Sequence, residues 1–375
     1  MENRMLDKIH LLGQSVWLDN LSRQILNNGE LEQLITQKGV RGLTSNPAIF
    51  QKAISGSDAY DEAIEKLANE GLERIKIYES MAIEDIQRAA DFFRPVYDAS
   101  NGEDGCVSLE VQPSLVYDTQ GTIEEGRHLW NSVNRPNVMI KVPGTKEGLP
   151  AITQLLSEGI NVNVTLLFSV DRYQAVTEAY MEGLEKRLEQ GESIQNVVSV
   201  ASFFLSRIDV MVDPMLEDII ENKPDHAEKA KSVMGETAIA NAKQAYKVFE
   251  KAFTGDRFQK LADQNGRKQR VLWASTGNKN PDYKELRYVH PLIGPDTVNT
   301  MPGDTLDILL DRGEEPTNQV AEGMGHADEV MATLEELGID MEKVTDDLEK
   351  EGVAKFEKPF NQLLDAIEEQ RKAHA

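Results

Sequence analysis

Eight short stretches with the residue content of β-strands recur along the chain, and segments with the apolar spacing of helices separate them. A strand, a helix and another strand in succession imply parallel pairing, because parallel strands need a long crossover connection. Eight such units predict a closed (β/α)₈ barrel of the TIM type, and strand counting leaves an open doubly wound sheet as the alternative. The predicted strands are residues 15–19, 40–46, 106–112, 138–142, 161–167, 197–203, 270–275 and 289–299.

The segments between these strands have the spacing of helices that cover a sheet. No low-complexity linker interrupts the chain, so we expect one barrel domain over residues 1–375. The charged tail, about residues 327–375, keeps helical spacing and predicts a helical extension packed on the barrel. The connection 209–269 is long for a barrel, and its role stays open. The predicted helical segments are residues 57–93, as two or three helices, 122–135, 149–158, 170–190 and 227–253.

The charge and the cysteine content limit which binding partners and which cellular compartment we expect. A net charge of −24 disfavours nucleic acid, which binds basic surfaces, but a small anionic substrate needs only a few local cations. The single cysteine, Cys106, cannot form an internal disulfide, which fits a reducing compartment. The sequence has no signal-peptide core and no apolar run of membrane-spanning length, about 18 residues. We therefore expect a soluble, cytoplasmic protein without nucleic-acid or membrane partners.

Polar residues on several predicted strands share one face. Residues two apart in a strand point to the same side, so Glu110 lies with Ser108 and Lys141 with Met139. In a barrel the apolar face packs against the helices and the polar face points inwards, towards an active site at the carboxyl ends of the strands. A buried ion pair between Lys141 and Glu110 is the structural alternative. The polar residues nearest the carboxyl ends are Asp19, Asn46, Glu110, Lys141 and Thr165.

This set of residues suits Schiff-base chemistry. An unprotonated lysine can attack a ketone, and the resulting iminium accepts electrons when the neighbouring carbon–carbon bond breaks. Such a reaction also needs a base and a second acid/base group, and Asp19 and Glu110 are available for these roles. Asn46, Asn163 and Ser202 could hold substrate hydroxyls. The six histidines show no paired ligand spacing, so we expect no metal.

A phosphate site is less clearly marked. Arg207 follows the sixth predicted strand, and Ser275 and Lys279 follow the seventh. Loops after the last strands of a barrel commonly bind phosphate through backbone amides and a helix start. A surface salt bridge is the alternative for Arg207, with Asp209 as its candidate partner. No phosphate-binding loop or dinucleotide fingerprint occurs in a strand–turn–helix setting.

Five segments together resemble the transaldolase family, in its order and near its spacing, and the fifth resembles the longer bacterial branch. The resemblance covers about residues 15–302 and implies a class I aldolase barrel that transfers a dihydroxyacetone unit between sugar phosphates without metal or organic cofactor. The segments are Leu43-Thr-Ser-Asn-Pro47, Ser108-Leu-Glu-Val111, Ile140-Lys-Val-Pro-Gly-Thr145, Asn161-Val-Asn-Val-Thr-Leu-Leu-Phe-Ser169 and Ala274-Ser-Thr-Gly-Asn-Lys-Asn280.

The same resemblance implies roles for individual residues. Lys141 would form the Schiff base, Asp19 would act on the C4 hydroxyl of the donor, and Glu110 with Thr165 would act through a water. The residues implied for substrate binding are Thr44, Asn46, Asn163 and Ser202 for the dihydroxyacetone part and Arg207, Ser275 and Lys279 for the phosphate. Other branches carry an arginine shortly after the serine of the seventh strand, whereas here the cation is Lys279, four residues beyond Ser275.

Two other functions remain open from the sequence. One is a Schiff-base fructose-6-phosphate aldolase that releases free dihydroxyacetone, although such chains are much shorter. The other is a barrel that binds sugar phosphates without catalysis. The sequence is compatible with a monomer or a homodimer.

Overall fold

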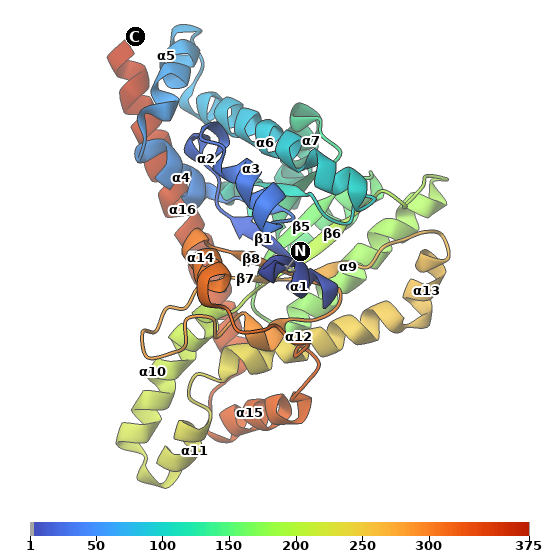
Figure 1. Cartoon of the computed structure of the whole chain (residues 1–375), viewed down its shortest axis with the longest axis vertical. Helices are drawn as coiled ribbons and strands as arrows, with labels where there is room; N and C mark the ends of the chain where they lie inside the picture. Colours follow the sequence, from blue (N-terminus) through green and yellow to red (C-terminus); the bar gives the residue numbers. More distant parts are fainter. Residues whose placement is uncertain (1–3, 375) are drawn as a thin grey trace.

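Eight parallel strands close into a barrel in the computed structural model, which describes residues 4–374 (Figure 1). Each strand pairs with its neighbours in the sequence, and β8 pairs with β1. The predicted barrel is therefore confirmed, and closure excludes the open sheet. The strands are β1 Gln14–Asp19, β2 Leu43–Thr44, β3 Val107–Glu110, β4 Val138–Pro143, β5 Val162–Leu167, β6 Ser199–Phe204, β7 Arg270–Ala274 and β8 Thr297–Met301.

Helices cover the outside of the barrel and extend it towards the C-terminus (Figure 1). No helix within residues 4–374 is long and apolar enough to cross a membrane. The α-helices up to the fifth strand are α1 Met5–Leu11, α2 Arg23–Asn27, α3 Glu30–Gln33, α4 Pro47–Ser55, α5 Asp61–Asn69, α6 Arg74–Ala99, α7 Thr119–Val133 and α8 Gly148–Ser157. The later ones are α9 Val170–Glu189, α10 Ser206–Asn222, α11 Ala227–Ser232, α12 Thr237–Thr254, α13 Asp256–Ala262, α14 Gly303–Arg312, α15 Met324–Glu336 and α16 Met341–His374.

Three predicted elements are wrong in their extent. In the predicted strand 40–46, only Leu43–Thr44 form a strand. The segment 289–299 is mostly not a strand: a 3₁₀ turn, His290–Leu292, precedes β8, because Pro291 and Pro295 have no amide hydrogen for a strand ladder. The segment 227–253 is two helices rather than one. Gly235 separates them with a φ of 68°, a left-handed conformation that ends a helical path.

The alternation of polar and apolar residues places the polar face inside the barrel, as predicted. The Nδ2 of Asn163 donates to Ser108 Oγ at 2.9 Å, and Ser202 Oγ donates to Asn163 Oδ1 at 2.7 Å. These bonds join β3, β5 and β6 across the barrel interior. On the opposite face, Val162 and Val164 are fully buried in the apolar core. The inner face thus carries the hydrogen-bonding groups that form the site.

A cluster of hydrogen-bonded side chains that contains one ion pair fills the barrel near the amino ends of the strands. Arg270 of β7 donates to Asp104 Oδ1 and to Ser15 Oγ, both at 3.0 Å. Ser15 Oγ in turn donates to the second carboxylate oxygen of Asp104 at 2.8 Å, and Trp17 Nε1 lies 3.4 Å from the first. We call Ser15, Trp17, Asp104 and Arg270 the floor cluster.

The last helix, α16, passes over the carboxyl ends of the strands. It contacts β5, α4 and α10. The ring of Phe360 packs edge-on against Tyr78 of α6, at 5.2 Å between ring centroids. The absent side chain of Gly352 permits close approach, since a Cβ there would lie 2.8 Å from Leu166 Cδ2 of β5. The predicted C-terminal extension is therefore helical and covers the mouth of the barrel.

Candidate active site

Lys141 lies on the inner face of β4, between Glu110 of β3 and Asn163 of β5 in the strand register. Its Nζ lies 3.4 Å from Glu110 Oε2 and donates to the carbonyl oxygen of Ser45 at 3.3 Å. The side chains of Lys141 and Glu110 are only 5% and 4% exposed. Both predicted partners are therefore buried together at the carboxyl end of the barrel.

Glu110 is held in a surrounding that favours its neutral form. Burial raises the pKa of its carboxyl group, the charge of Lys141 opposes this rise, and the charge of Asp19 adds to it. Glu110 Oε2 has no hydrogen-bond partner in the described structure, and neither has the buried Oγ1 of Thr165. Buried polar atoms without partners are rare, so these two atoms have unused capacity for a water or a substrate group.

Asp19 ends β1 at the same mouth. Burial raises the pKa of its carboxyl group, whereas the charge of Lys141 and a hydrogen bond from Thr44 lower it. Thr44 Oγ1 donates to Asp19 Oδ1 at 2.7 Å. The charges of Arg207 and Lys279 also favour the carboxylate, which places both cations within electrostatic range of Asp19.

The predicted hydroxyl-binding residues are divided between the interior and the rim. Asn163 and Ser202 are buried inside the barrel and bond to each other through Ser202 Oγ. Asn46 lies at the start of α4, where its Oδ1 accepts the amide hydrogen of Ile49 at 3.0 Å and caps the helix. Its half-buried side chain thus has a structural bond as well as a place at the rim.

Two of the predicted phosphate residues, Arg207 and Ser275, lie at the start of α10. Ser206 Oγ and Ser275 Oγ lie 2.9 Å apart, which brings Ser275 next to Arg207. Burial lowers the pKa of Arg207, and its Nη1 is buried without a partner. Lys279 is exposed.

The alternative salt bridge from Arg207 to Asp209 is wrong. The carboxylate of Asp209 instead accepts the amide hydrogen of Ala238 at 2.7 Å and the hydroxyl hydrogen of Tyr288 at 2.8 Å. On α10, successive residues diverge by about 100° around the axis, so a pair two positions apart faces different neighbours.

Comparison with known proteins assigns the family. The model of the transaldolase/fructose-6-phosphate aldolase family matches residues 16–367. A transaldolase of Trichodesmium erythraeum is 47% identical over 374 residues, which are 99% of this chain and 98% of the relative. A protein named transaldolase 2 from a Nostoc species is 48% identical over 95% of this chain and 94% of its own. A transaldolase of a Parafrankia species is 47% identical over 98% of both chains.

The chain belongs to the transaldolase/fructose-6-phosphate aldolase family.

Three groups around the site were not predicted from the sequence. The carbonyl oxygen of Ser45 accepts from Lys141, and backbone atoms carry no signal in a residue pattern. The Nζ of Lys141 lies 5.9 Å from the ring centroid of Phe356 on α16. Thr300 of β8 reaches Thr44 across β1. Both side chains approach the site only once the barrel has closed and α16 has packed over it.

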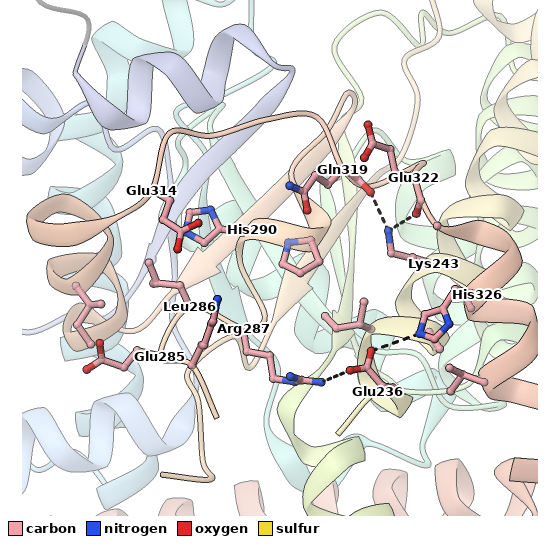
Figure 2. Close-up of a pocket in the computed structure, with 18 of the residues that line it drawn as sticks. Glu236, Lys243, Glu285, Leu286, Arg287, His290, Glu314, Gln319, Glu322 and His326 are labelled. Carbon is pink, nitrogen blue, oxygen red and sulfur yellow. Dashed lines mark hydrogen bonds and ion pairs between the residues drawn. The ribbon is translucent and has the colours of Figure 1, made fainter. Parts of the chain in front are cut away.

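A cavity of about 640 Å³ lies outside the barrel (Figure 2). It is lined by α12, α15 and the segment 284–291, and none of the candidate site residues lines it. Two ion pairs line it, Arg287 with Glu236 and Arg312 with Glu285, whereas Arg287 Nε and His290 Nε2 are buried without a hydrogen-bond partner. Lys243 donates to the carbonyl oxygens of residues 319, 320 and 322.

Proposed function

We propose that the protein is a transaldolase that transfers a dihydroxyacetone unit from sedoheptulose 7-phosphate to glyceraldehyde 3-phosphate. The products are erythrose 4-phosphate and fructose 6-phosphate. The main support is the buried Lys141 amine beside Glu110, with Asp19 at the same mouth of the barrel. Relatives that match nearly the whole chain bear the name transaldolase, which supports the same activity.

Bond cleavage follows from a Schiff base on Lys141. The amine adds to the C2 ketone of the donor, and loss of water gives an iminium. Asp19 removes the proton of the C4 hydroxyl, the C3–C4 bond breaks, and its electron pair forms an enamine as erythrose 4-phosphate leaves. The enamine then attacks the aldehyde carbon of glyceraldehyde 3-phosphate, and Asp19 returns its proton to the new hydroxyl. Hydrolysis frees fructose 6-phosphate and the amine.

Glu110 and Thr165 serve the formation and hydrolysis of the imine. Each has a buried oxygen without a hydrogen-bond partner, and one water between them would satisfy both. Burial raises the pKa of Glu110, which fits a group that both gives and accepts a proton during these steps. The water removed from the carbinolamine and the water that later attacks the iminium would occupy this position.

Substrate binding is divided between two groups of residues. Asn46, Asn163 and Ser202, with Thr44, would hold the dihydroxyacetone hydroxyls. Arg207, Ser275 and Lys279 would hold the phosphate, and the unpartnered Nη1 of Arg207 supports this assignment.

Release of free dihydroxyacetone is the second candidate activity, since the family model covers fructose-6-phosphate aldolases as well. The two activities differ in the fate of the enamine, which is protonated in an aldolase and captured by an aldehyde in a transferase. We expect fructose 6-phosphate and erythrose 4-phosphate to yield sedoheptulose 7-phosphate far faster than fructose 6-phosphate alone yields dihydroxyacetone. Comparable rates in the two assays would favour the aldolase.

Borohydride trapping tests the Schiff base directly. Fructose 6-phosphate and borohydride should leave a stable adduct on wild-type protein, and peptide mass mapping should place it on Lys141. Lys243 is a matched control, because it is also a buried lysine but lies outside the barrel mouth. Lys141→Ala should give no adduct. A wild-type protein without an adduct on Lys141 would refute the mechanism.

Asp19→Asn separates imine formation from cleavage. The asparagine keeps the hydrogen bond from Thr44 but cannot remove a proton, so transfer should fall by about 10²- to 10⁴-fold. Trapping with fructose 6-phosphate should persist, because imine formation does not use Asp19. Wild-type transfer rates in this variant would remove Asp19 from the mechanism.

A further inference from the structure

Two threonine hydroxyls extend from Asp19 into the barrel. Thr44 Oγ1 lies 2.7 Å from Asp19 Oδ1 and 2.6 Å from Thr300 Oγ1. Thr44 and Thr300 are buried, on β2 and β8, the strands on either side of β1. The backbone of Thr300 is fixed as well, since its carbonyl oxygen accepts the hydroxyl hydrogen of Thr276 at 3.2 Å. Thr44 therefore lies between Thr300 and Asp19 in this chain of hydrogen bonds.

The directions of these two bonds depend on each other. An ionised Asp19 can only accept, so Thr44 must give it its single hydrogen, and Thr300 must then donate to Thr44. A hydroxyl that accepts a hydrogen bond becomes a stronger donor, because hydrogen bonds in a chain polarise one another. A protonated Asp19 would favour the opposite arrangement. The hydroxyl of Thr300 therefore bears on the charge state of a carboxylate that it does not contact.

We propose that Thr300 is a positioning residue for carbon–carbon bond cleavage, acting through Thr44 to hold Asp19 as an oriented carboxylate. This inference rests on the proposed role of Asp19 as the base. The other charged groups that bear on Asp19 are Lys141, Arg207 and Lys279, and Asp19 in turn acts on Glu110. None of them bonds to Thr300, so a change at Thr300 tests the hydroxyl chain alone.

Thr300→Val removes the hydroxyl and keeps the shape of the side chain. Loss of one hydrogen bond in the chain should lower kcat for transfer at neutral pH by about three- to tenfold. It should also move the acidic limb of the kcat profile to higher pH, because Asp19 loses support for its charged form. Thr300→Ser should restore both properties, and trapping of the fructose 6-phosphate adduct should be unchanged in both variants.

A double-mutant cycle with Thr44→Val tests the route of the effect. If Thr300 acts through Thr44, Thr300→Val should cause no further loss in a Thr44→Val background. Thr297→Val is a matched control on the same strand, since the Thr297 hydroxyl is buried but bonds to Gly294 and Gln14 near the amino end. That control should leave the pH profile in place.

The possible results separate this inference from the proposed function. An unshifted pH profile in Thr300→Val, additive losses in the double variant, or the same shift in Thr297→Val would each overturn the role of Thr300. Absence of an adduct on wild-type protein would instead overturn the Schiff-base mechanism. A shifted acidic limb with normal trapping, serine rescue and non-additive loss would establish the role.

Discussion

The barrel buries one pair of oppositely charged side chains at each of its two ends, and the two pairs differ in their hydrogen bonding. In the floor cluster the Arg270 and Asp104 side chains are 8% and 3% exposed and meet at 3.0 Å. At the mouth, Lys141 and Glu110 are 5% and 4% exposed and lie 3.4 Å apart. In the described structure, neither Arg270 nor Asp104 has a buried polar atom without a hydrogen-bond partner, whereas Glu110 Oε2, which has only its ion pair with Lys141, and Thr165 Oγ1 each lack one.

Burial alone therefore does not distinguish a structural ion pair from a reactive one. Removing charge from water costs several kcal/mol per ion, and only a full set of partners offsets this cost. The floor cluster has such a set, from Arg270 to Ser15 and Trp17. The pair at the mouth lacks a full set of hydrogen-bond partners. A substrate or a water would bind at the atoms that have none. Between these two buried pairs, incomplete hydrogen bonding rather than burial marks the pair at the mouth.

The sharpest test of this difference replaces the cation at the mouth. Lys141→Met should abolish transfer and trapping, because no other group there can form the imine. The free energy of unfolding should change by about 1 kcal/mol or less, since the raised pKa of Glu110 lets it become neutral without its partner. Activity assays and urea denaturation measure the two effects. A loss of stability as large as that expected for the floor cluster would contradict the comparison.

Replacing the cation of the floor cluster should have the opposite result. Arg270→Met leaves Asp104 buried without its closest cation, which should cost about 3–5 kcal/mol of stability. The kcat per active site, counted from the trapped adduct, should stay within about twofold of wild type. Urea denaturation gives the stability. Unchanged stability would show that the floor cluster contributes nothing that apolar packing cannot replace.

A smaller effect concerns Glu110 and pH. Its pKa is raised in the folded protein, so wild type loses stability as pH increases from the ordinary carboxyl range through that raised value. Glu110→Gln does not titrate, so its stability relative to wild type should increase over this range, by on the order of 1 kcal/mol. Thermal unfolding from pH 4 to 9 measures the difference. Glu125→Gln, on α7 outside the barrel, is the matched control, and a difference independent of pH would contradict the raised pKa.

The sequence predicted those parts of the structure that follow from the alternation of side chains between the two faces of a strand. The alternation around Lys141, Glu110 and Asn163 placed them on one inner face, and the strand register confirms that they are neighbours. The residue types then indicated Schiff-base chemistry, and the family resemblance indicated the substrates. These inferences needed only local order along each strand.

Contacts that depend on closure of the barrel or on the packing of α16 could not be predicted from the alternation along single strands. Thr300 meets Thr44 because β8 returns to β1, and a linear pattern does not contain that return. Phe356 was one apolar residue among several in a charged tail, and only the path of α16 brings it to Lys141. Asp104 precedes β3 rather than lying on it, so strand alternation could not assign it to the floor cluster.

Natural variation or design could change either the barrel strands or α16, and the two kinds of substitution should have different effects. The proposed catalytic groups project from the barrel strands and the segments that follow them, whereas the surface above them comes from one helix with few ties to those strands. Substitutions along the inner side of α16 that keep Gly352 and Phe356 could therefore change which acceptor aldehydes enter while the bond-breaking groups stay intact. A library confined to the other positions of α16 would be a natural starting point for new acceptors.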